Sequence, residues 1–335
     1  MRRVDRRSEL LLYWIEAQLN ARSLTLEPAS ADASFRRYFR VSVAGCSYIA
    51  MDAPPEQEDC RPYVRVAGLM SQAGVHVPRV IAQDLEQGFL LLSDLGTTSY
   101  LQALNTDSAD ALFRDATEAL LRWQLASKPG MLPPYDEELL RREINLFPQW
   151  YIGRHLGLEL NAAQQRALDA MLALILKRAL AQPVVYVHRD YMPRNLMVCD
   201  PNPGVLDFQD AVCGPVTYDV ASLFRDAFIS WEEESVLDWT ARYWEKARRA
   251  GLPVAADFSD FYRDFEWMGL QRHLKVLGIF ARLHYRDGKR GYLEDTPRFV
   301  GYARAVAARY GALAPLAALF DEIEGTTAAR VGYTF

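Results

Sequence analysis

Apolar and polar positions alternate over short runs in the first part of the chain, and this pattern is typical of β-strands. Before these runs, residues 8–20 carry apolar side chains at helical spacing, so the chain is predicted to begin with an amphipathic helix. Residues 39–43 and 47–51 are predicted as strands joined by a turn at Ala44 and Gly45. The other elements predicted in this part are a helix over residues 61–73 and strands over 80–83 and 88–93.

After Gly96 the periodicity changes to that of helices, and strands become brief interruptions. Helices are predicted over residues 108–127, 136–155 and 162–181, short strands over 184–187, 196–198 and 204–206, and further helices from 220 to the last residues. We therefore expect an α+β fold with a small β-rich lobe over residues 1–95 and a larger, mainly helical lobe over 96–335. A hinge is expected between them at residues 93–96.

Composition and charge narrow the class of partner. Half of the 335 residues are apolar, and the net charge of -5, with no block of lysine and arginine, argues against a nucleic-acid partner. No apolar run approaches the ~20 residues that span a bilayer, so no membrane partner is expected. Glu9 and Glu16 interrupt the apolar run near the N-terminus, which favours a helix over a signal peptide and predicts a cytoplasmic protein. The four cysteines form no C-x-x-C pair, so free thiols are expected and zinc is not.

The segment most informative about chemistry contains Asp190, Asn195 and Asp207. Phosphoryl transfer requires neutralisation of the charge on the phosphates and an acceptor hydroxyl held in line. Magnesium prefers oxygen ligands, which Asp207 and Asn195 provide from two adjacent short strands. Asp190, on the loop before the first of them, can accept the proton of the hydroxyl. The pattern therefore predicts a magnesium-dependent kinase.

The order H-x-D-x-x-x-x-N, from His188 to Asn195, followed by L-D-F at Asp207, resembles the catalytic and metal-binding segments of protein kinases. The later G-P-x-x-x-D, ending at Asp219, and the absence of an A-P-E segment are similar to the aminoglycoside phosphotransferase family. Residues 33–40, 51–55 and 271–275 resemble the anomeric sugar kinases of bacterial cell-wall recycling, whose acceptors are N-acetylmuramate and N-acetylglucosamine. The resemblance covers nearly the whole chain and implies a bilobal, protein-kinase-like fold.

The resemblance also implies roles for individual residues. Asp190 matches the catalytic base, Asn195 and Asp207 match the Mg2+ ligands, and Asp219 matches the buried aspartate that braces the catalytic loop. His188 is expected to be a structural brace under that loop. Three groups of nucleotide contacts are expected. The loop in the place of the phosphate-covering loop would contribute Ser34, Phe35, Arg36 and Arg37. The hinge would contribute Ser93 and Leu95, and Arg194 would reach the γ-phosphate. ATP and a small-molecule sugar are the implied partners.

Three departures from the protein-kinase pattern concern the phosphates. The expected phosphate loop has no G-x-G-x-x-G, and Met51 stands where protein kinases carry a lysine on the third strand. The following helix contains no glutamate to pair with such a lysine. Another cation is therefore expected to hold the phosphates, and the candidates are Arg36, Arg37 and Arg65.

Four residues are candidates for binding the acceptor. Trp150 and Tyr151 can stack on a sugar face, although aromatic residues at this spacing also pack between helices. Arg272 can grip a substrate carboxylate, or belong to a solvated helix face. Asp210 can contact substrate or metal, or cap a turn.

Two other functions remain open at this point. One is a kinase for an aminoglycoside, an amino alcohol or an amino acid on the same fold. The other is a pseudokinase-like nucleotide-binding protein, suggested by Met51 and the glycine-free loop but opposed by the intact Asp190, Asn195 and Asp207. The sequence predicts neither the oligomeric state nor the nucleotide preference.

Overall fold

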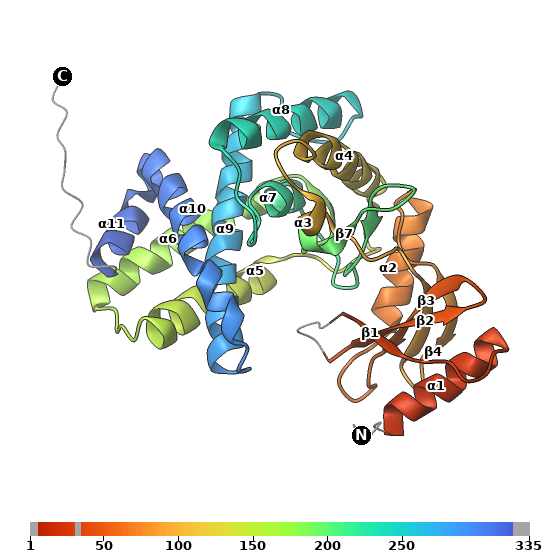
Figure 1. Cartoon of the computed structure of the whole chain (residues 1–335). Coiled ribbons are helices and arrows are strands. Elements are labelled where there is room, and N and C mark those ends of the chain that lie inside the picture. The colour runs from red at the N-terminus through yellow and green to blue at the C-terminus, as the bar shows by residue number, and fades with distance from the viewer. Residues whose placement is uncertain (1–5, 31–34, 324–335) are drawn as a thin grey trace. The chain divides into compact units, whose positions relative to one another are not determined.

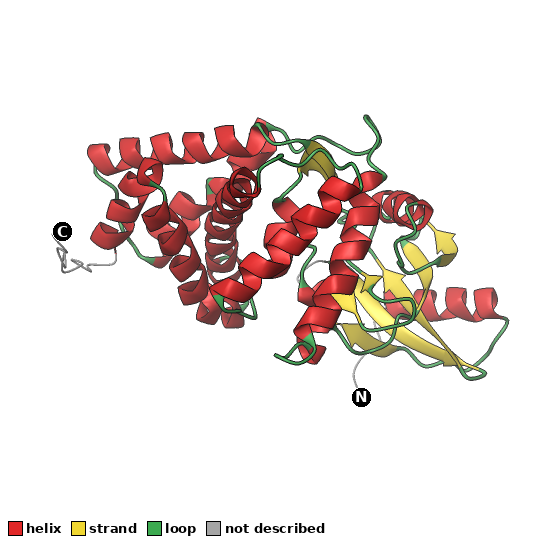
Figure 2. Ribbon diagram, turned by 90° about the horizontal axis from the view of Figure 1, so that it is seen from above, coloured by secondary structure: helices red, strands yellow, loops and turns green. Residues whose placement is uncertain are grey.

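The computed structural model describes residues 6–30 and 35–323. The chain divides into two compact units, each made of two segments. Unit 1 comprises Met1–Ala126 and His188–Ala211, and unit 2 comprises Ser127–Val187 and Val212–Phe335. Figure 1 follows the chain from red to blue, and Figure 2 distinguishes its strands, in yellow, from its helices, in red. Residues 188–211, called the catalytic segment for the role that the sequence predicts, therefore belong to the same unit as the sheet, and the predicted lobe boundary after residue 95 stays a prediction.

An antiparallel sheet forms the first part of unit 1. Its strands are β1 (Glu27–Ser30), β2 (Arg37–Val43), β3 (Cys46–Asp52), β4 (Val80–Asp84) and β5 (Phe89–Ser93). The strand order is β1-β2-β3-β5-β4, and every neighbouring pair is antiparallel. The four strands predicted before residue 96 are confirmed.

The turn between β2 and β3 follows from its two residues. Ala44 and Gly45 both have positive φ, 50° and 81°, as a tight two-residue hairpin loop requires. Helix α1 (Arg6–Leu19) covers the sheet. The buried residues of this small core come from both elements: Leu11, Ile15, Val41, Ala50, Phe89 and Leu91. The predicted N-terminal helix and hairpin are confirmed.

The edge strand β1 was not predicted from the sequence. Glu27–Ser30 has no alternation of apolar and polar residues, and Pro28 lacks the N–H that a central strand would need. Among the described strands it pairs with β2 alone, in a register that shifts between Pro28 and Ser30. Its pairing is therefore set by the neighbouring hairpin rather than by its own pattern.

Helices of unit 1 follow the sheet. Helix α2 (Arg61–Gln72) is the predicted one, and Gly74, with φ of +74°, lies just beyond its end. It is followed by the short α3 (Tyr100–Ala103) and by α4 (Ala109–Leu125), which lies within the range predicted for it. The catalytic segment adds a 3-10 turn (Pro193–Asn195) and the hairpin of β7 (Leu196–Met197) and β8 (Gly204–Val205).

Unit 2 consists mainly of helices arranged around one long, deeply buried helix. This is α9 (Phe258–Tyr285), which is buried without interruption from Phe265 to Gly278. The others are α5 (Glu137–Ile144), η1 (Phe147–His155), α6 (Ala162–Leu180), α7 (Tyr218–Phe224), α8 (Glu233–Arg249), η3 (Arg290–Asp295), α10 (Thr296–Arg309), η4 (Gly311–Leu313) and α11 (Ala314–Ile323). None of the helices that the structure describes is both long and apolar enough to cross a membrane.

The prediction of one helix over residues 136–155 is wrong. Helix α5 ends at Ile144, and the chain continues as a π-helix from Phe147, with Leu156 N donating to Tyr151 O at 2.9 Å. Pro148 has no N–H for an α-helical hydrogen bond. A Cβ added at Gly278 of α9 would lie 2.3 Å from the Leu146 carbonyl carbon, so the backbone of α9 comes very close to the chain at this break.

A second strand in unit 2 was also missed. The predicted strand β6 (Val184–Val187) pairs antiparallel with β9 (Val212–Pro215), whose Gly214 and Pro215 carry the signals of a turn. The catalytic segment begins directly after β6 and ends directly before β9.

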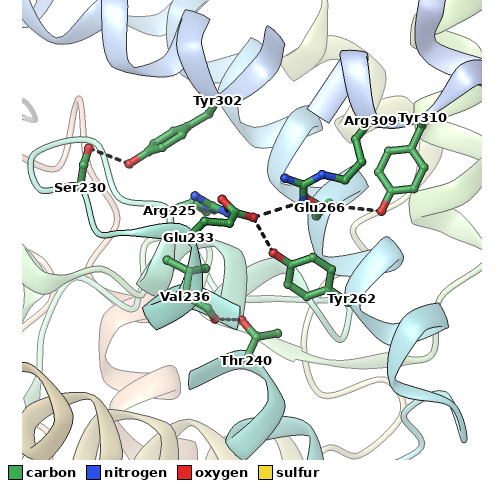
Figure 3. A network of polar contacts seen from close by, with 10 residues as sticks. All are labelled: Arg225, Ser230, Glu233, Val236, Thr240, Tyr262, Glu266, Tyr302, Arg309 and Tyr310. Atoms are coloured by element: carbon green, nitrogen blue, oxygen red, sulfur yellow. Dashed lines mark hydrogen bonds and ion pairs between the residues drawn. The ribbon is translucent and has the colours of Figure 1, made fainter. Parts of the chain in front are cut away.

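A polar network joins three helical segments of unit 2 (Figure 3). Glu233 of α8 accepts hydrogen bonds from Tyr262 of α9 at 2.8 Å and from Arg309 at 3.2 Å. Arg309, the last residue of α10, also pairs with Glu266 of α9, and the Tyr310 hydroxyl donates to Glu266 at 2.5 Å. Burial raises the pKa of Glu266, and its hydrogen bond from Tyr310 and the charge of Arg309 oppose that shift. The ends of these helices are therefore held by charge as well as by packing.

Candidate active site

Two non-glycine residues of the catalytic segment have backbone in the left-handed region. Arg189 has φ of 77° and Asp207 has φ of 61°. Such a conformation costs about 1–3 kcal/mol and persists only where the surrounding structure enforces it. One of the two directly precedes Asp190, and the other is the predicted metal ligand. Backbone strain is therefore present at two positions of the segment for which the sequence predicts chemistry.

His188 links the loop of Asp190 to the backbone of Leu206 by two hydrogen bonds. Its Nε2 lies 3.0 Å from the Leu206 carbonyl, which can only accept, so Nε2 carries the proton. Its Nδ1 then accepts from the Asp190 N–H at 3.2 Å. Burial lowers the pKa of His188 to about 4, so the ring is neutral and keeps this arrangement at neutral pH. The buried imidazole ties the residue before Asp207 to the backbone of Asp190.

Asp190 and Asn195 lie on a tightly wound loop. The Asn195 Nδ2 donates to the Asp190 carbonyl at 2.9 Å, Met192 N donates to the same carbonyl at 2.9 Å, and Asn195 N donates to Met192 O at 2.8 Å. The carboxylate of Asp190 is part-exposed. These bonds fix the loop backbone and leave the carboxylate accessible, as a base that must meet a hydroxyl requires.

Asp207 and Asn195 face each other at the end of the β7–β8 hairpin. The Asn195 Nδ2 lies 3.5 Å from Asp207 Oδ2, and Leu206 N donates to Asn195 O at 2.9 Å. Because the Asn195 amide nitrogen is engaged by the Asp190 carbonyl, its amide oxygen is the end suited to a cation. One carboxylate and one amide oxygen fit Mg2+, which takes its other ligands from phosphates and water. Among the described residues no group of three His, Cys, Asp or Glu side chains forms a metal site.

Sequence reasoning missed Gln209. Its Nε2 donates to Asp207 Oδ1 at 2.8 Å and lies 3.4 Å from Asp210 Oδ2. The neighbouring Phe208 is buried against Tyr63 of α2, with ring centroids 4.7 Å apart. Burial holds the pKa of Tyr63 well above its usual value, so the phenol stays neutral. Gln209 and Phe208 thus orient the carboxylate of Asp207. The only signal of this role in the sequence is that they directly follow Asp207.

The three candidate phosphate-binding arginines have different partners and exposure in the structure. Arg36, just before β2, has its Nε 3.2 Å from Glu58 Oε2 and its Nη2 4.0 Å from Asp210 Oδ2. Arg37 instead donates its Nε to Asp52 Oδ2 at 2.9 Å, and the other oxygen of this buried carboxylate accepts from Arg7 Nε at 2.9 Å. Arg65 is exposed on α2.

Two residues of the predicted hinge, Ser93 and Leu95, contact neighbouring parts of unit 1. Ser93 Oγ accepts from Arg79 N at 2.9 Å, so its hydroxyl is engaged within the sheet. Leu95 is 8 % exposed, and a Cβ added at Gly204 would lie 2.7 Å from Leu95 Cδ1. Glycine at position 204 therefore lets the β7–β8 hairpin approach the hinge.

Asp94 was part of the predicted hinge, but its partners were not foreseen. Arg40 donates to both carboxylate oxygens, at 2.6 and 3.0 Å, and Ser47 Oγ donates at 2.5 Å. Burial alone would raise the pKa of Asp94, but the hydrogen bonds from Arg40, Ser47 and Gly96 N–H bring it below its usual value. A charged brace thus ties the start of the hinge to β2 and β3.

Three other predicted nucleotide contacts have less defined surroundings. Ser34 lies outside the described residues. Phe35 is 62 % exposed, and Arg194 is exposed on the 3-10 turn before Asn195. Their roles stay predictions.

The remaining predicted residues, apart from Asp210, belong to unit 2. Trp150 is half-buried, whereas Tyr151 is buried and stacks on Phe147 with ring centroids 5.6 Å apart. Arg272 is 2 % exposed, and Asp219 is fully buried in the first turn of α7. Asp210 is exposed at the end of the catalytic segment in unit 1.

Comparison with known proteins places this site in a family. Residues 25–258 match the model of the phosphotransferase enzyme family. The chain is 54% identical to an N-acetylmuramate/N-acetylglucosamine kinase of Pseudomonas putida over 96% of this chain and 97% of that protein. It is 57% identical to a protein of the same name from Pseudomonas aeruginosa, over 89% of this chain and 88% of that protein.

A solved structure shows the same fold at low sequence identity. The GDP complex of aminoglycoside 2'-phosphotransferase-IIIa superposes with a TM-score of 0.63 and 14% identity, covering 91% of this chain and 100% of that one. The predicted protein-kinase-like fold is therefore confirmed.

Proposed function

Because this chain belongs to the phosphotransferase enzyme family, we propose that it transfers the γ-phosphoryl group of ATP to the anomeric hydroxyl of N-acetylmuramate and N-acetylglucosamine. The family makes it a kinase, and family members of this kind use ATP and a divalent metal ion. The acceptors are those in the names of relatives that are 54% and 57% identical over most of their length. The anomeric position and a role in recycling cell-wall sugars come from the resemblance of residues 33–40, 51–55 and 271–275.

The observation that carries the proposal is the braced loop of Asp190 beside Asn195 and Asp207. In the proposed reaction the anomeric oxygen attacks the γ-phosphorus, its proton passes to the Asp190 carboxylate, and ADP leaves. An anomeric hydroxyl is more acidic than the other sugar hydroxyls because the ring oxygen withdraws electrons from C1. A weak base such as a carboxylate suits it. Asn195 and Asp207 would hold the cation, which we propose is Mg2+ and which would supply neutralising charge to the phosphates.

The braces are assigned positioning roles. His188 and Asp219 would hold the catalytic loop, so that Asp190 needs no rearrangement when the acceptor arrives. Residues 1–95 would cover the nucleotide, with Ser93 and Leu95 at the adenine and Arg194 at the γ-phosphate. Residues 96–335 would carry catalysis and acceptor binding.

The acceptor contacts we propose are Trp150, Tyr151, Asp210 and Arg272. Half-buried Trp150 has the character of a platform for a sugar face. Arg272 can form a bidentate pair with the lactyl carboxylate of N-acetylmuramate. Arg272 is only 2 % exposed, so with N-acetylglucosamine, which lacks that carboxylate, the guanidinium would need another anionic partner. The buried Asp226, with which Arg272 interacts electrostatically, would supply it.

A cytoplasmic location is part of the same proposal. The reaction needs ATP, which the cytoplasm supplies. The cysteines Cys46, Cys60, Cys199 and Cys213 are all free thiols, as expected in a reducing compartment.

The decisive experiment compares N-acetylglucosamine with its 1-O-methyl glycoside, with ADP release and phosphorus NMR of the product as readouts. We expect phosphorylation of the first and none of the second. Comparable turnover of the methyl glycoside would show that another hydroxyl is the acceptor. Choline and an aminoglycoside are run beside them, and turnover of either above that of both sugars would overturn the choice of substrate while leaving the kinase activity intact.

A further inference from the structure

The resemblance to protein kinases implies that an apolar residue of this chain, Met51, stands at the position of their phosphate-binding lysine. Met51 lies on β3, is fully buried, and pairs with Tyr38 of β2 and Leu90 of β5. Helix α2, Arg61–Gln72, contains no acidic residue. Yet the triphosphate of ATP carries more negative charge than one divalent cation neutralises. A cation from elsewhere in the fold must therefore complete the phosphate site.

Arg36 is the arginine whose surroundings match that requirement. Its side chain is only 12% exposed, and its Nε lies 3.2 Å from Glu58 Oε2, which is itself 18% exposed. Burial alone would lower the pKa of Arg36, but nearby Tyr38, Glu58, Asp207 and Asp210 raise it overall. The guanidinium therefore stays charged in a sheltered place, within electrostatic reach of Asp207.

The other two candidates are used differently. Arg37 shares the buried carboxylate of Asp52 with Arg7, so it is an element of the sheet's own structure. Arg65 is exposed, where water screens a charge strongly. Arg36 alone among the three combines a part-buried charge with a nearby metal-ligand candidate.

The geometry around Arg36 also suggests how it would engage a phosphate. A guanidinium has a fork of five N–H donors, and the Nε–H directed at Glu58 fixes the orientation of the plane. The Nη2 lies 4.0 Å from Asp210 Oδ2, a carboxylate that is 58% exposed. A phosphate oxygen at this edge would exchange with the exposed Asp210 carboxylate, while Nε stays on Glu58.

We propose that Arg36, oriented by Glu58, binds the β- and γ-phosphates of ATP and replaces the lysine–glutamate pair of protein kinases. Arg36 is the ligand of the phosphates, and Glu58 is a positioning residue that acts through it. Arg36 lies just before β2, and Glu58 lies in the connection between β3 and α2. In protein kinases the lysine lies on the third strand and the glutamate on the helix that follows it. This inference rests on the proposed kinase function but not on the identity of the acceptor.

The test is calorimetric titration of adenosine, ADP and ATP, each with Mg2+, into the full-length protein. Arg36→Gln should weaken ATP binding by ~10- to 100-fold, as expected for loss of hydrogen bonds to a charged group, and should leave adenosine binding unchanged. Glu58→Gln should weaken ATP binding by a smaller factor, and Glu58→Asp should restore part of it. A merely structural role would weaken adenosine and ATP together, so dependence on the number of phosphates is the discriminating result.

Neighbouring residues provide matched controls. Asp59, in the same connection, and Arg61, the first residue of α2, form an exposed ion pair at 2.9 Å, with side chains 50% and 76% exposed. Asp59→Asn and Arg61→Gln change the same charges as the test variants and should leave ATP affinity within about twofold, as exposed pairs do. If Arg36→Gln does not fold, Arg36→Lys keeps the charge and Glu58→Gln keeps the arginine, and either carries the same comparison.

The outcomes separate this inference from the proposed function. If Arg36→Gln and Glu58→Gln bind ATP as the wild type does, the inference is wrong, whatever sugar is phosphorylated. If ATP affinity depends on Arg36 as described but neither sugar is phosphorylated, the inference holds and the proposed acceptor is wrong. If Arg61→Gln weakens ATP binding as much as Arg36→Gln does, the effect belongs to the net charge of the region and the inference is wrong.

Discussion

Replacing His188 with phenylalanine tests whether one buried imidazole holds the catalytic loop. The ring is fully buried, with Nε2 3.0 Å from the Leu206 carbonyl and Nδ1 3.2 Å from the Asp190 amide. Phenylalanine fills a similar volume but leaves both backbone groups without this partner. Each buried group left unsatisfied costs about 1–3 kcal/mol, so the free energy of unfolding at pH 7 should fall by roughly 2–4 kcal/mol, since the Asp190 amide is only partly buried.

The pH dependence of that loss follows from the pKa of His188. Burial lowers this pKa from 6.5 to about 4, although the charge of Asp190 opposes the shift. The unfolded chain then binds its proton at higher pH than the folded protein, so wild-type stability falls as pH drops from 6.5 towards 4. A difference of that size corresponds to about 3 kcal/mol in total. The variant has no imidazole at this position and does not lose this stability. The difference in unfolding free energy between the two proteins should therefore narrow between pH 6.5 and 4.

Urea unfolding at pH 7, 5.5 and 4.5 measures the gap, and steady-state kinetics at pH 7 measure the catalytic effect. Because the loop carries Asp190, kcat should fall by about 10- to 100-fold while the KM for ATP changes little. His284→Phe, at a part-exposed position near the end of α9, controls for the substitution itself and should change neither quantity. A gap of equal size at pH 7 and 4.5, or a wild-type kcat in His188→Phe, would refute the reasoning.

Three further predictions concern other charged groups. Asp190→Ala should lower kcat by ~10²-fold or more with ATP binding preserved, as measured by single-turnover kinetics and titration, and near-normal turnover would remove it from the mechanism. Asp207→Ala should abolish activity and the magnesium dependence of ATP affinity, so magnesium that still tightens ATP binding would contradict the metal assignment. Glu266→Gln should lower the unfolding free energy by about 1–3 kcal/mol in urea, because Arg309 and Tyr310 lose a charged acceptor, and an unchanged midpoint would refute that role.

The elements that the sequence predicted well are those with a strong local signal. The β2–β3 hairpin combines alternating residues with Ala44 and Gly45 at positive φ, and α2 has a stripe of buried residues ended by Gly74. In each case neighbouring residues along the chain contain the determining interaction.

The elements that were missed depend on residues far away in the sequence. Periodicity continues through residues 136–155, but Pro148 and the close approach of Gly278 to Leu146 produce a π-helix instead of a continuous α-helix. Strand β9 exists because β6 supplies its hydrogen-bonding partners, while its own Gly and Pro indicate a turn. Tertiary contacts override the local pattern at both places, and a single sequence contains no direct record of those contacts.

The same distinction explains which functional residues could be recognised. A cation ligand and a base must sit at fixed offsets on one loop, so Asp190, Asn195 and Asp207 form a pattern along the chain. A positive charge for the phosphates has no such constraint, because a long, flexible side chain can reach the same point from several elements. Once β3 carries an apolar Met51, a glutamate on α2 would be a buried charge without a partner, which costs several kcal/mol. Its absence from α2 therefore accompanies the loss of the lysine, and the acidic partner is expected beside whichever cation takes over. Glu58 beside Arg36 meets that expectation, although neither position had a motif to mark it as half of a pair.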